Sequence, residues 1–293
     1  MQTKFTGSIT AMITPFRNGK VDYDAFGKFI HWQLEQGTHG FVPCGTTGES
    51  PTLNHADHNE VIKFCIKETK GKIPVIAGTG SNSTDEAIDM SVEAEKNGAD
   101  ALLIVTPYYN KPTQEGIFQH FKAIDKAVGI PILVYNVPGR TVVDIKDETL
   151  LRLIELKNIK GVKDATGNLD RVKFLKKHVS AEFAYIGGED DLAVKINELG
   201  GCGTISVTSN VAPKLCAEMQ SLSLAGKTAE AEKIQAKLMP LHSAMFCETS
   251  PGPVKYAAKL LGLCDGSLKL PLVEIADSSK QTVKAAMKGL SLI

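Results

Sequence analysis

Residues 159–165 read Ile-Lys-Gly-Val-Lys-Asp-Ala, a short apolar run that carries a lysine at position 163. Side chains alternate between the two faces of a strand. The odd-numbered residues of this stretch, from Ile159 through Lys163 to Ala165, are therefore expected to share one face. We predict a β-strand here, with Lys163 among small and apolar neighbours.

Seven similar runs occur along the chain, and helical patterns separate them. The eight runs lie at residues 7–15, 40–44, 74–79, 101–108, 131–137, 159–165, 183–187 and 203–208. Amphipathic stretches between them include residues 23–36, 55–69, 83–97, 114–128 and 146–156. Alternation of strand and helix indicates parallel strands joined by crossover helices.

Eight such units favour a closed barrel over an open doubly wound sheet. A doubly wound sheet usually has fewer units and a glycine-rich dinucleotide loop after its first strand. Here residues 14–19 read Thr-Pro-Phe-Arg-Asn-Gly, which lacks that pattern. The chain after the eighth run reads as helices at 212–224, 228–244, 253–261 and 272–287. We predict an α/β fold, a (β/α)₈ TIM barrel over residues 1–225 with a C-terminal helical appendage over 226–293.

The composition is typical of a globular protein and excludes several classes of partner. Of 293 residues, 43% are hydrophobic and 23% are charged, and 33 basic residues balance 33 acidic ones. Zero net charge does not favour binding to nucleic acid or to an anionic membrane. No apolar run approaches the roughly 20 residues that a membrane-spanning helix needs.

The cysteines and the N-terminus indicate a location in the cytoplasm. The six cysteines form no C-x-x-C pair and no zinc-like spacing, so we expect buried, reduced thiols. Residues 1–16 read as a first strand and not as a signal peptide.

Active sites of such barrels lie at the C-terminal ends of the strands. Inside the barrel the low dielectric favours a neutral Lys163 amine, the nucleophile that forms an imine with a ketone. Tyr135 ends the neighbouring strand and could relay protons. Residues 45–48, Gly-Thr-Thr-Gly, could form a nest of N–H groups for an anion. Each feature has a plainer explanation: a lysine that reaches solvent, a structural tyrosine and an ordinary turn.

Two kinds of site are not expected. Many barrels bind phosphate after strands seven and eight, but here the seventh run is followed by Glu189, Asp190 and Asp191. His55 and His58 are the only close histidine pair, and they lie on an early helix. We therefore expect no metal and no cofactor.

Three motifs carry a family resemblance. Residues 45–49 (Gly-Thr-Thr-Gly-Glu), 135–141 (Tyr-Asn-Val-Pro-Gly-Arg-Thr) and 161–164 (Gly-Val-Lys-Asp) resemble the dihydrodipicolinate synthase family. The similarity covers nearly the whole chain, in order, including the helical tail. The wider superfamily also holds N-acetylneuraminate lyase and keto-deoxy sugar-acid aldolases.

The resemblance implies a Schiff-base lyase that condenses pyruvate with aspartate semialdehyde to 4-hydroxy-tetrahydrodipicolinate, for lysine and diaminopimelate synthesis. It implies that Lys163 forms the imine with pyruvate. It also implies a proton relay of Tyr135, Thr46 and Tyr109, with Tyr109 donated by a neighbouring subunit. Packing against its own barrel is the plainer reading of Tyr109.

The resemblance also assigns substrate-binding residues and an assembly. Thr46 and Thr47 help to hold the pyruvate carboxylate, and Arg140 binds the carboxylate of aspartate semialdehyde. Gly188 and Ile205 line the site. The implied assembly is a homotetramer made of two dimers.

In lysine-sensitive members of the family, a set of residues corresponds to an inhibitory lysine site at the dimer interface. The set is Ser50, Pro51, His55, His58, Asn82, Glu86 and Tyr108. Helix starts also use such residues. Asn54 suits an N-cap, Ser83-x-x-Glu86 reads as a capping box, and both histidines fit an exposed first turn.

Two other functions stay open at this point. A sibling lyase for a sugar acid would typically carry Ser-Thr in place of Thr46-Thr47 and would lack Arg140. A non-enzymatic binding barrel would lack Lys163 or Tyr135. Arg140 is the residue that favours a short aldehyde with a carboxylate.

Overall fold

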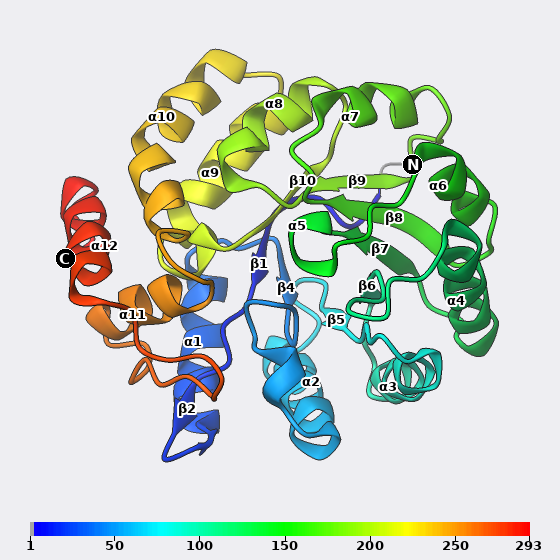
Figure 1. Cartoon of the computed structure of the whole chain (residues 1–293). Helices are drawn as coiled ribbons and strands as arrows, with labels where there is room; N and C mark the ends of the chain where they lie inside the picture. Colours follow the sequence, from blue (N-terminus) through cyan, green and yellow to red (C-terminus); the bar gives the residue numbers. More distant parts are fainter. Residues whose placement is uncertain (1–2) are drawn as a thin grey trace.

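The computed structural model describes residues 3–293 as a parallel barrel surrounded by helices (Figure 1). Its eight strands pair in the order β4-β1-β10-β9-β8-β7-β6-β5. A parallel bridge between Phe41 and Val75 joins the two outer members of this order and closes the ring. The strands are β1 (Gly7–Ala11), β4 (Gly40–Val42), β5 (Ile76–Gly78), β6 (Ala101–Val105), β7 (Ile132–Asn136), β8 (Ile159–Asp164), β9 (Ala184–Gly187) and β10 (Gly203–Ser206). The predicted TIM barrel is confirmed.

Helices follow the strands on the outside of the barrel. They are α1 (Tyr23–Glu35), α2 (His55–Thr69), α3 (Thr84–Lys96), α4 (Gln114–Ala127), α6 (Asp147–Ile154), α7 (Leu169–Lys176), α8 (Ala193–Glu198) and α9 (Pro213–Leu224). Short elements occupy some loops: the hairpin β2 (Phe16–Arg17) and β3 (Lys20–Val21), the turn α5 (Pro138–Thr141), and 3₁₀ turns at Ser50–Thr52, Asp190–Leu192 and Thr208–Asn210.

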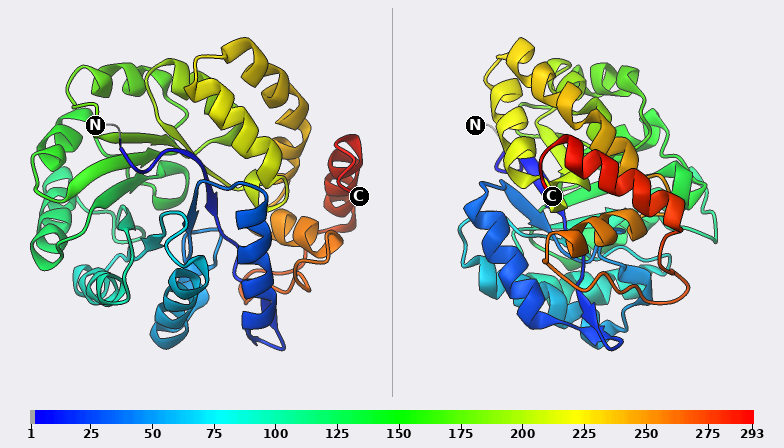
Figure 2. Two further views of the ribbon diagram at one scale, coloured as in Figure 1. Left: turned by 180° about the vertical axis from the view of Figure 1, so that it is seen from behind. Right: turned by 90° about the vertical axis from the view of Figure 1, so that its left-hand side faces the viewer.

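The C-terminal appendage consists of α10 (Thr228–Ala244), α11 (Gly252–Leu260) and α12 (Asp277–Gly289), which lie on one side of the barrel (Figure 2). The predicted start of the last helix at 272 is wrong. Residues 268–276 form a loop that is tied to other segments, since Lys269 N–H donates to Glu49 and Ala276 N–H donates to Glu248. The division at residue 225 stays a prediction.

Lys163 faces the interior of the barrel, as predicted. In the register of the sheet it stands beside Tyr135 of β7 and Ile186 of β9, which belong to the inner apolar cluster. Ile159 is a correction, because it packs in the outer cluster under the helices with Val162. The pairing of β7 and β8 shifts register near Ile132, so strict alternation fails at the start of β8.

The start of α2 confirms one prediction and corrects another. Asn54 caps the helix, and its side chain accepts a hydrogen bond from Asp57 N–H at 2.8 Å. His58 is not a surface residue, because its side chain is only 1% exposed. It is the fourth helical residue and faces the barrel.

The start of α3 forms only half of the predicted capping box. Ser83 Oγ accepts from Glu86 N–H at 3.5 Å. The Glu86 carboxylate does not return to Ser83 N–H. It accepts instead from Ser81 Oγ at 2.7 Å, and Ser81 Oγ in turn accepts from Ser83 N–H at 3.0 Å.

All six cysteines are free thiols, but they are not uniformly buried. Cys44, Cys65 and Cys216 are buried, as expected. Cys247 is exposed, and Cys202 and Cys264 are half-buried. The prediction of six buried thiols is therefore wrong for half of them.

Candidate functional site

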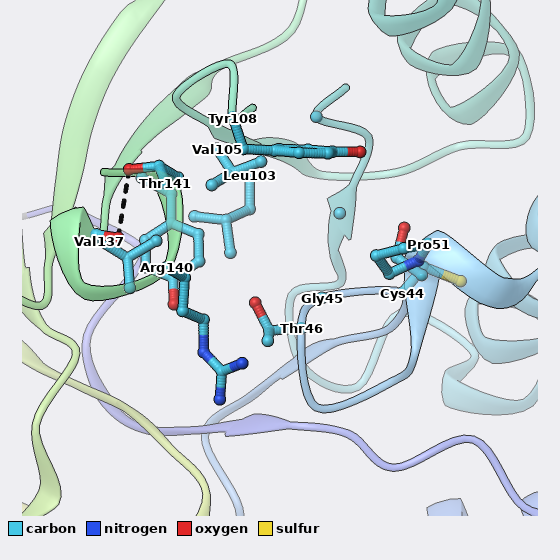
Figure 3. Close-up of a pocket in the computed structure, with 14 residues that line it drawn as sticks. Cys44, Gly45, Thr46, Pro51, Leu103, Val105, Tyr108, Val137, Arg140 and Thr141 are labelled. Atoms are coloured by element: carbon cyan, nitrogen blue, oxygen red, sulfur yellow. Dashed lines mark hydrogen bonds between the residues drawn. The ribbon is translucent and has the colours of Figure 1, made fainter. Parts of the chain in front are cut away.

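A cavity of about 220 Å³ opens at the C-terminal ends of β4 to β7 (Figure 3). Its lining comes from the loops that follow these four strands. The lining residues are Cys44, Gly45, Thr46, Ser50, Pro51, Gly78, Gly80, Leu103, Val105, Tyr108, Tyr135, Val137, Arg140 and Thr141. The structure thus brings the 45–48 turn, Tyr135 and Arg140 together in one cavity. The sequence predicted only that all three lie at the C-terminal end of the barrel.

Lys163 lies directly beside this cavity. Its Nζ is 4.0 Å from the centroid of the Tyr135 ring, and the residue is 7% exposed. Within residues 3–293, no carboxylate lies within ion-pair distance of Lys163 Nζ, and that nitrogen has no hydrogen-bond acceptor. A buried primary amine without a counter-ion is suited to attack a carbonyl carbon.

The Gly45–Gly48 turn has two backbone N–H groups, those of Thr46 and Thr47, that are not used in holding the turn together. Gly48 N–H donates to Gly45 C=O and Glu49 N–H donates to Thr46 C=O, both at 3.1 Å. In the described part of the chain, the N–H groups of Thr46 and Thr47 have no protein acceptor. Adjacent free N–H groups in a turn attract an anion. The turn can therefore bind a carboxylate next to the Lys163 amine.

Two contacts fix that turn against the barrel. Thr14 Oγ1 donates to Gly48 C=O at 2.7 Å. A Cβ on Gly48 would lie 3.1 Å from both Met12 O and Cys44 N, so a larger residue would have to displace this backbone by a few tenths of an ångström. The position of the turn is therefore set by the segments that directly follow β1 and β4.

Arg140 stands on α5, the short turn that follows β7. Thr141 Oγ1 holds this turn together by hydrogen bonds to Val137 C=O at 3.2 Å and Val143 C=O at 2.9 Å. Arg140 is exposed at the mouth of the cavity, and Figure 3 shows its guanidinium reaching to the side where Thr46 lies. It makes no ion pair with any described residue, so its planar fork is available to a carboxylate.

Gly188 and Ile205, the other two residues that the resemblance assigns to the lining, do not border this cavity. Gly188 N–H donates to Asp164 C=O at 2.7 Å, next to Lys163. A Cβ on Gly188 would lie 2.6 Å from the Cβ of Ala165, so any larger residue there would force Ala165 to shift. Ile205 belongs to the inner apolar cluster of the barrel.

Glu189 does not line this cavity, but its carboxyl group is close enough to Lys163 to feel its charge. Burial raises the pKa of Glu189, the Asp191 charge raises it further, and the Lys163 charge opposes both. In the sequence, only its position directly after Gly188 indicated that Glu189 lies in this region.

The structure does not place all residues of the predicted lysine site together. Ser50, Pro51 and Tyr108 line the same cavity as Thr46. His55 Nε2 lies 3.5 Å from the Glu86 carboxylate.

Asn82 and His58 make different contacts. The Asn82 C=O accepts from Asn110 Nδ2 at 2.8 Å. His58 is sealed in the interior, and neither of its ring nitrogens has a partner among the described residues. Burial lowers the pKa of His58 to about 4, so it is neutral at pH 7.

Tyr109 points away from its own barrel. It is 90% exposed, has a left-handed backbone with φ of +71°, and does not border the cavity of its own chain. Packing against its own barrel, the plainer reading, is therefore wrong.

Comparison with known proteins assigns the family. The sequence profile of the Dihydrodipicolinate synthetase family matches residues 4–290. The chain belongs to this family. A 4-hydroxy-tetrahydrodipicolinate synthase from Parvibaculum lavamentivorans is 57% identical over 99% of both chains.

Two solved structures of the family share the whole fold. The chloride-inhibited dihydrodipicolinate synthase from Acinetobacter baumannii, in complex with pyruvate, has a TM-score of 0.96 and 45% identity over 98% of this chain and 99% of that one. The enzyme from Cyanidioschyzon merolae with lysine bound has a TM-score of 0.96 and 37% identity over 100% of both chains. The family predicted from the three motifs is confirmed, and so is a lyase of the synthase type over the sibling sugar-acid aldolase.

Within residues 3–293, no helix is long and apolar enough to cross a membrane. No group of three or more His, Cys, Asp or Glu side chains there could hold a metal ion.

Proposed function

We propose that this chain is a 4-hydroxy-tetrahydrodipicolinate synthase that binds pyruvate as an imine on Lys163 and joins it to aspartate semialdehyde. One observation carries the proposal: the unpaired Lys163 amine lies 4.0 Å from the Tyr135 ring, beside a cavity that the Gly45–Gly48 turn lines. Amine, phenol and anion nest are the groups that imine chemistry on a 2-keto acid requires.

The first steps build a nucleophile from pyruvate. The Lys163 amine gives up a proton and adds to the ketone carbon, and loss of water gives the imine. Tyr135 and Thr46, with Tyr109 of a neighbouring subunit, pass the protons. The Thr46 and Thr47 N–H groups hold the pyruvate carboxylate. Loss of a methyl proton then converts the imine to an enamine, whose terminal carbon is nucleophilic.

The later steps use the second substrate. The enamine carbon attacks the aldehyde carbon of aspartate semialdehyde, and the resulting alkoxide takes a proton to become a hydroxyl group. The amino group of that substrate then adds to the imine carbon and expels the Lys163 amine, which closes the ring. Arg140 at the cavity mouth binds the carboxylate of aspartate semialdehyde and orients it.

Assembly and regulation follow from the same residues. Exposed Tyr109 crosses to the site of a second copy, and two such dimers form a homotetramer. Lysine binds between subunits near Ser50, Pro51, His55, Asn82, Glu86 and Tyr108, and inhibits by disturbing the adjacent Tyr109. Sealed His58 supports this site from behind and does not touch the ligand. The location in the cytoplasm stays a prediction.

A steady-state assay with both substrates tests the proposal. Wild-type protein is expected to consume pyruvate and aspartate semialdehyde together. Arg140→Ala should raise the KM for aspartate semialdehyde strongly and leave the KM for pyruvate within about twofold, because the interactions lost are those of one substrate. Turnover of a neutral sugar-acid aldehyde but not of aspartate semialdehyde would overturn the assignment.

A further inference from the structure

A fully buried ion pair connects the C-terminal appendage to the Gly45–Gly48 turn. Lys255 of α11 and Glu49, the residue directly after that turn, are each 0% exposed. Lys255 Nζ lies 2.5 Å from Glu49 Oε1. The two residues are 206 positions apart in the sequence.

Four segments meet at this pair. Lys255 Nζ also donates to Ser267 C=O at 2.6 Å and lies 4.1 Å from the centroid of the Phe16 ring. The second oxygen of Glu49 accepts from Lys269 N–H at 2.9 Å. Both carboxylate oxygens and the ammonium are therefore satisfied without water, by groups from β2, α11 and the loop after α11.

Glu49 takes an unusual backbone conformation to reach its partner. Its φ of +59° is left-handed, which costs a non-glycine residue on the order of 1 kcal/mol. Tertiary contacts must maintain such a conformation. Thr52 N–H and Thr52 Oγ1 both donate to Glu49 C=O at 3.0 Å, so the residue also anchors the following 3₁₀ turn.

The pair is placed where it can control the two free N–H groups. Glu49 N–H closes the turn through Thr46 C=O at 3.1 Å. A movement of Glu49 therefore tilts the peptide that joins Thr46 to Thr47, which carries one of the two free N–H groups. Nothing in the chemistry of the imine requires a charge at position 49, and a stable core alone would accept an apolar pair there.

We propose that Lys255 is a positioning residue for pyruvate: through Glu49 it holds the Thr46–Thr47 turn in the conformation that binds the substrate carboxylate. The appendage thereby takes part in substrate binding although none of its residues lines the cavity. This inference rests on the proposed role of the turn and of Lys163.

Borohydride trapping measured against pyruvate concentration tests the inference, because it reports pyruvate binding without the second substrate. In Lys255→Met the half-saturating pyruvate concentration should rise about tenfold or more, since a displacement of about 1 Å can cost on the order of 10²-fold. The double variant Lys255→Met/Glu49→Gln should recover part of this loss, because it removes the unpaired buried charge. The matched control is Lys259→Met, an exposed lysine on the same helix, with half-saturation unchanged.

A purely structural role predicts a different pattern. Lys255→Met would then melt at a lower temperature and keep the wild-type half-saturation, and that result overturns the inference. If Lys255→Met does not fold, Glu49→Gln decides, with a rise of about threefold expected and no rise contradicting the proposal. Wild-type protein that gives no adduct on Lys163 would refute the proposed function itself, which separates the two failures.

Discussion

Two walls of the cavity that we propose as the catalytic site are held by buried charges in contrasting ways. On one wall, Lys255 and Glu49 form a dry pair. On the other, Arg171 of α7 is 7% exposed and lies within 3.2 Å of carboxylate oxygens of Asp144, Asp147 and Asp164. Asp164 follows Lys163, and Asp144 also accepts from Asn136, the residue after Tyr135, at 2.7 Å. Both arrangements therefore support residues next to the reacting groups.

The contrast lies in redundancy and in contact with water. Glu49 has one cationic partner, whereas Arg171 has three anionic ones, and the side chains of Asp144 and Asp147 are partly exposed. Burial alone would raise the pKa of Asp144, but hydrogen bonds from Arg171 and Asn136 hold it below its usual value. If one carboxylate of this network is removed, water and the two remaining carboxylates can still interact with Arg171. Within residues 3–293, Glu49 is paired with Lys255 alone, and both side chains are fully buried.

The largest expected effect is on the dry pair. Lys255→Met should lower the free energy of unfolding by about 3–5 kcal/mol, because it leaves an unpaired charge in the interior. Urea unfolding followed by circular dichroism measures this loss, with Lys259→Met as the control. A loss under about 1 kcal/mol would mean that water reaches Glu49 and that the two walls are alike.

The free energy of unfolding of this protein should also depend on pH, because two of its histidines are buried. This dependence has to be known before the stabilities of the two walls are compared at acidic pH. Burial lowers the pKa of His58 and of His120 to about 4, from 6.5 in the unfolded chain. As the pH falls, these histidines therefore take up protons in the unfolded state before they do so in the folded state. The stability that the two neutral histidines contribute is complete above pH 6.5 and is lost as the pH falls from 6.5 to 4. At pH 5 we expect each histidine to lower the free energy of unfolding by on the order of 1–2 kcal/mol.

Replacing one histidine checks this reading. His120 Nδ1 lies 3.0 Å from Thr84 Oγ1, and His120→Asn keeps a polar atom near that position. The variant should lose less stability than the wild type between pH 7 and pH 5 in urea unfolding. If both proteins lose the same free energy of unfolding between pH 7 and pH 5, groups other than His120 cause the acid sensitivity. The stabilities of the two walls would then have to be compared at neutral pH only.

The smallest expected effect is in the Arg171 network. Asp147→Asn removes one of three carboxylates, at a side chain that is partly exposed, 3.0 Å from Arg171 Nε. We expect a loss of about 0.5 kcal/mol, typical of an exposed ion pair. Double-mutant cycles with Arg171→Met measure the coupling. If Asp147 and Arg171 are coupled as strongly as Lys255 and Glu49, the Arg171 network is not redundant and the two walls do not differ in this respect.

Local patterns predicted most of the barrel. Apolar runs located all eight strands, Asn54 marked the start of α2, and alternation placed Lys163 inside. The errors arose where tertiary packing overrides a local rule. A register shift moved Ile159 to the outer face, and burial removed His58 from the surface.

The site was predictable only in part, for a physical reason. Strand ends and the family motifs indicated the turn, Tyr135, Lys163 and Arg140. The partner of Glu49 lies on a helix that reads as an ordinary amphipathic segment, in which a lysine is expected to face water. A contact between residues 206 positions apart has no local signature, so only the folded chain shows it.

The central claim, an imine between pyruvate and Lys163, is tested most directly by reduction and mass mapping. Wild-type protein is incubated with pyruvate and borohydride, digested, and analysed peptide by peptide. We expect one reduced three-carbon adduct per chain, on Lys163, and none in Lys163→Ala, which should keep the fold. An adduct on exposed Lys160 or on another lysine, or no adduct at saturating pyruvate, would contradict the account.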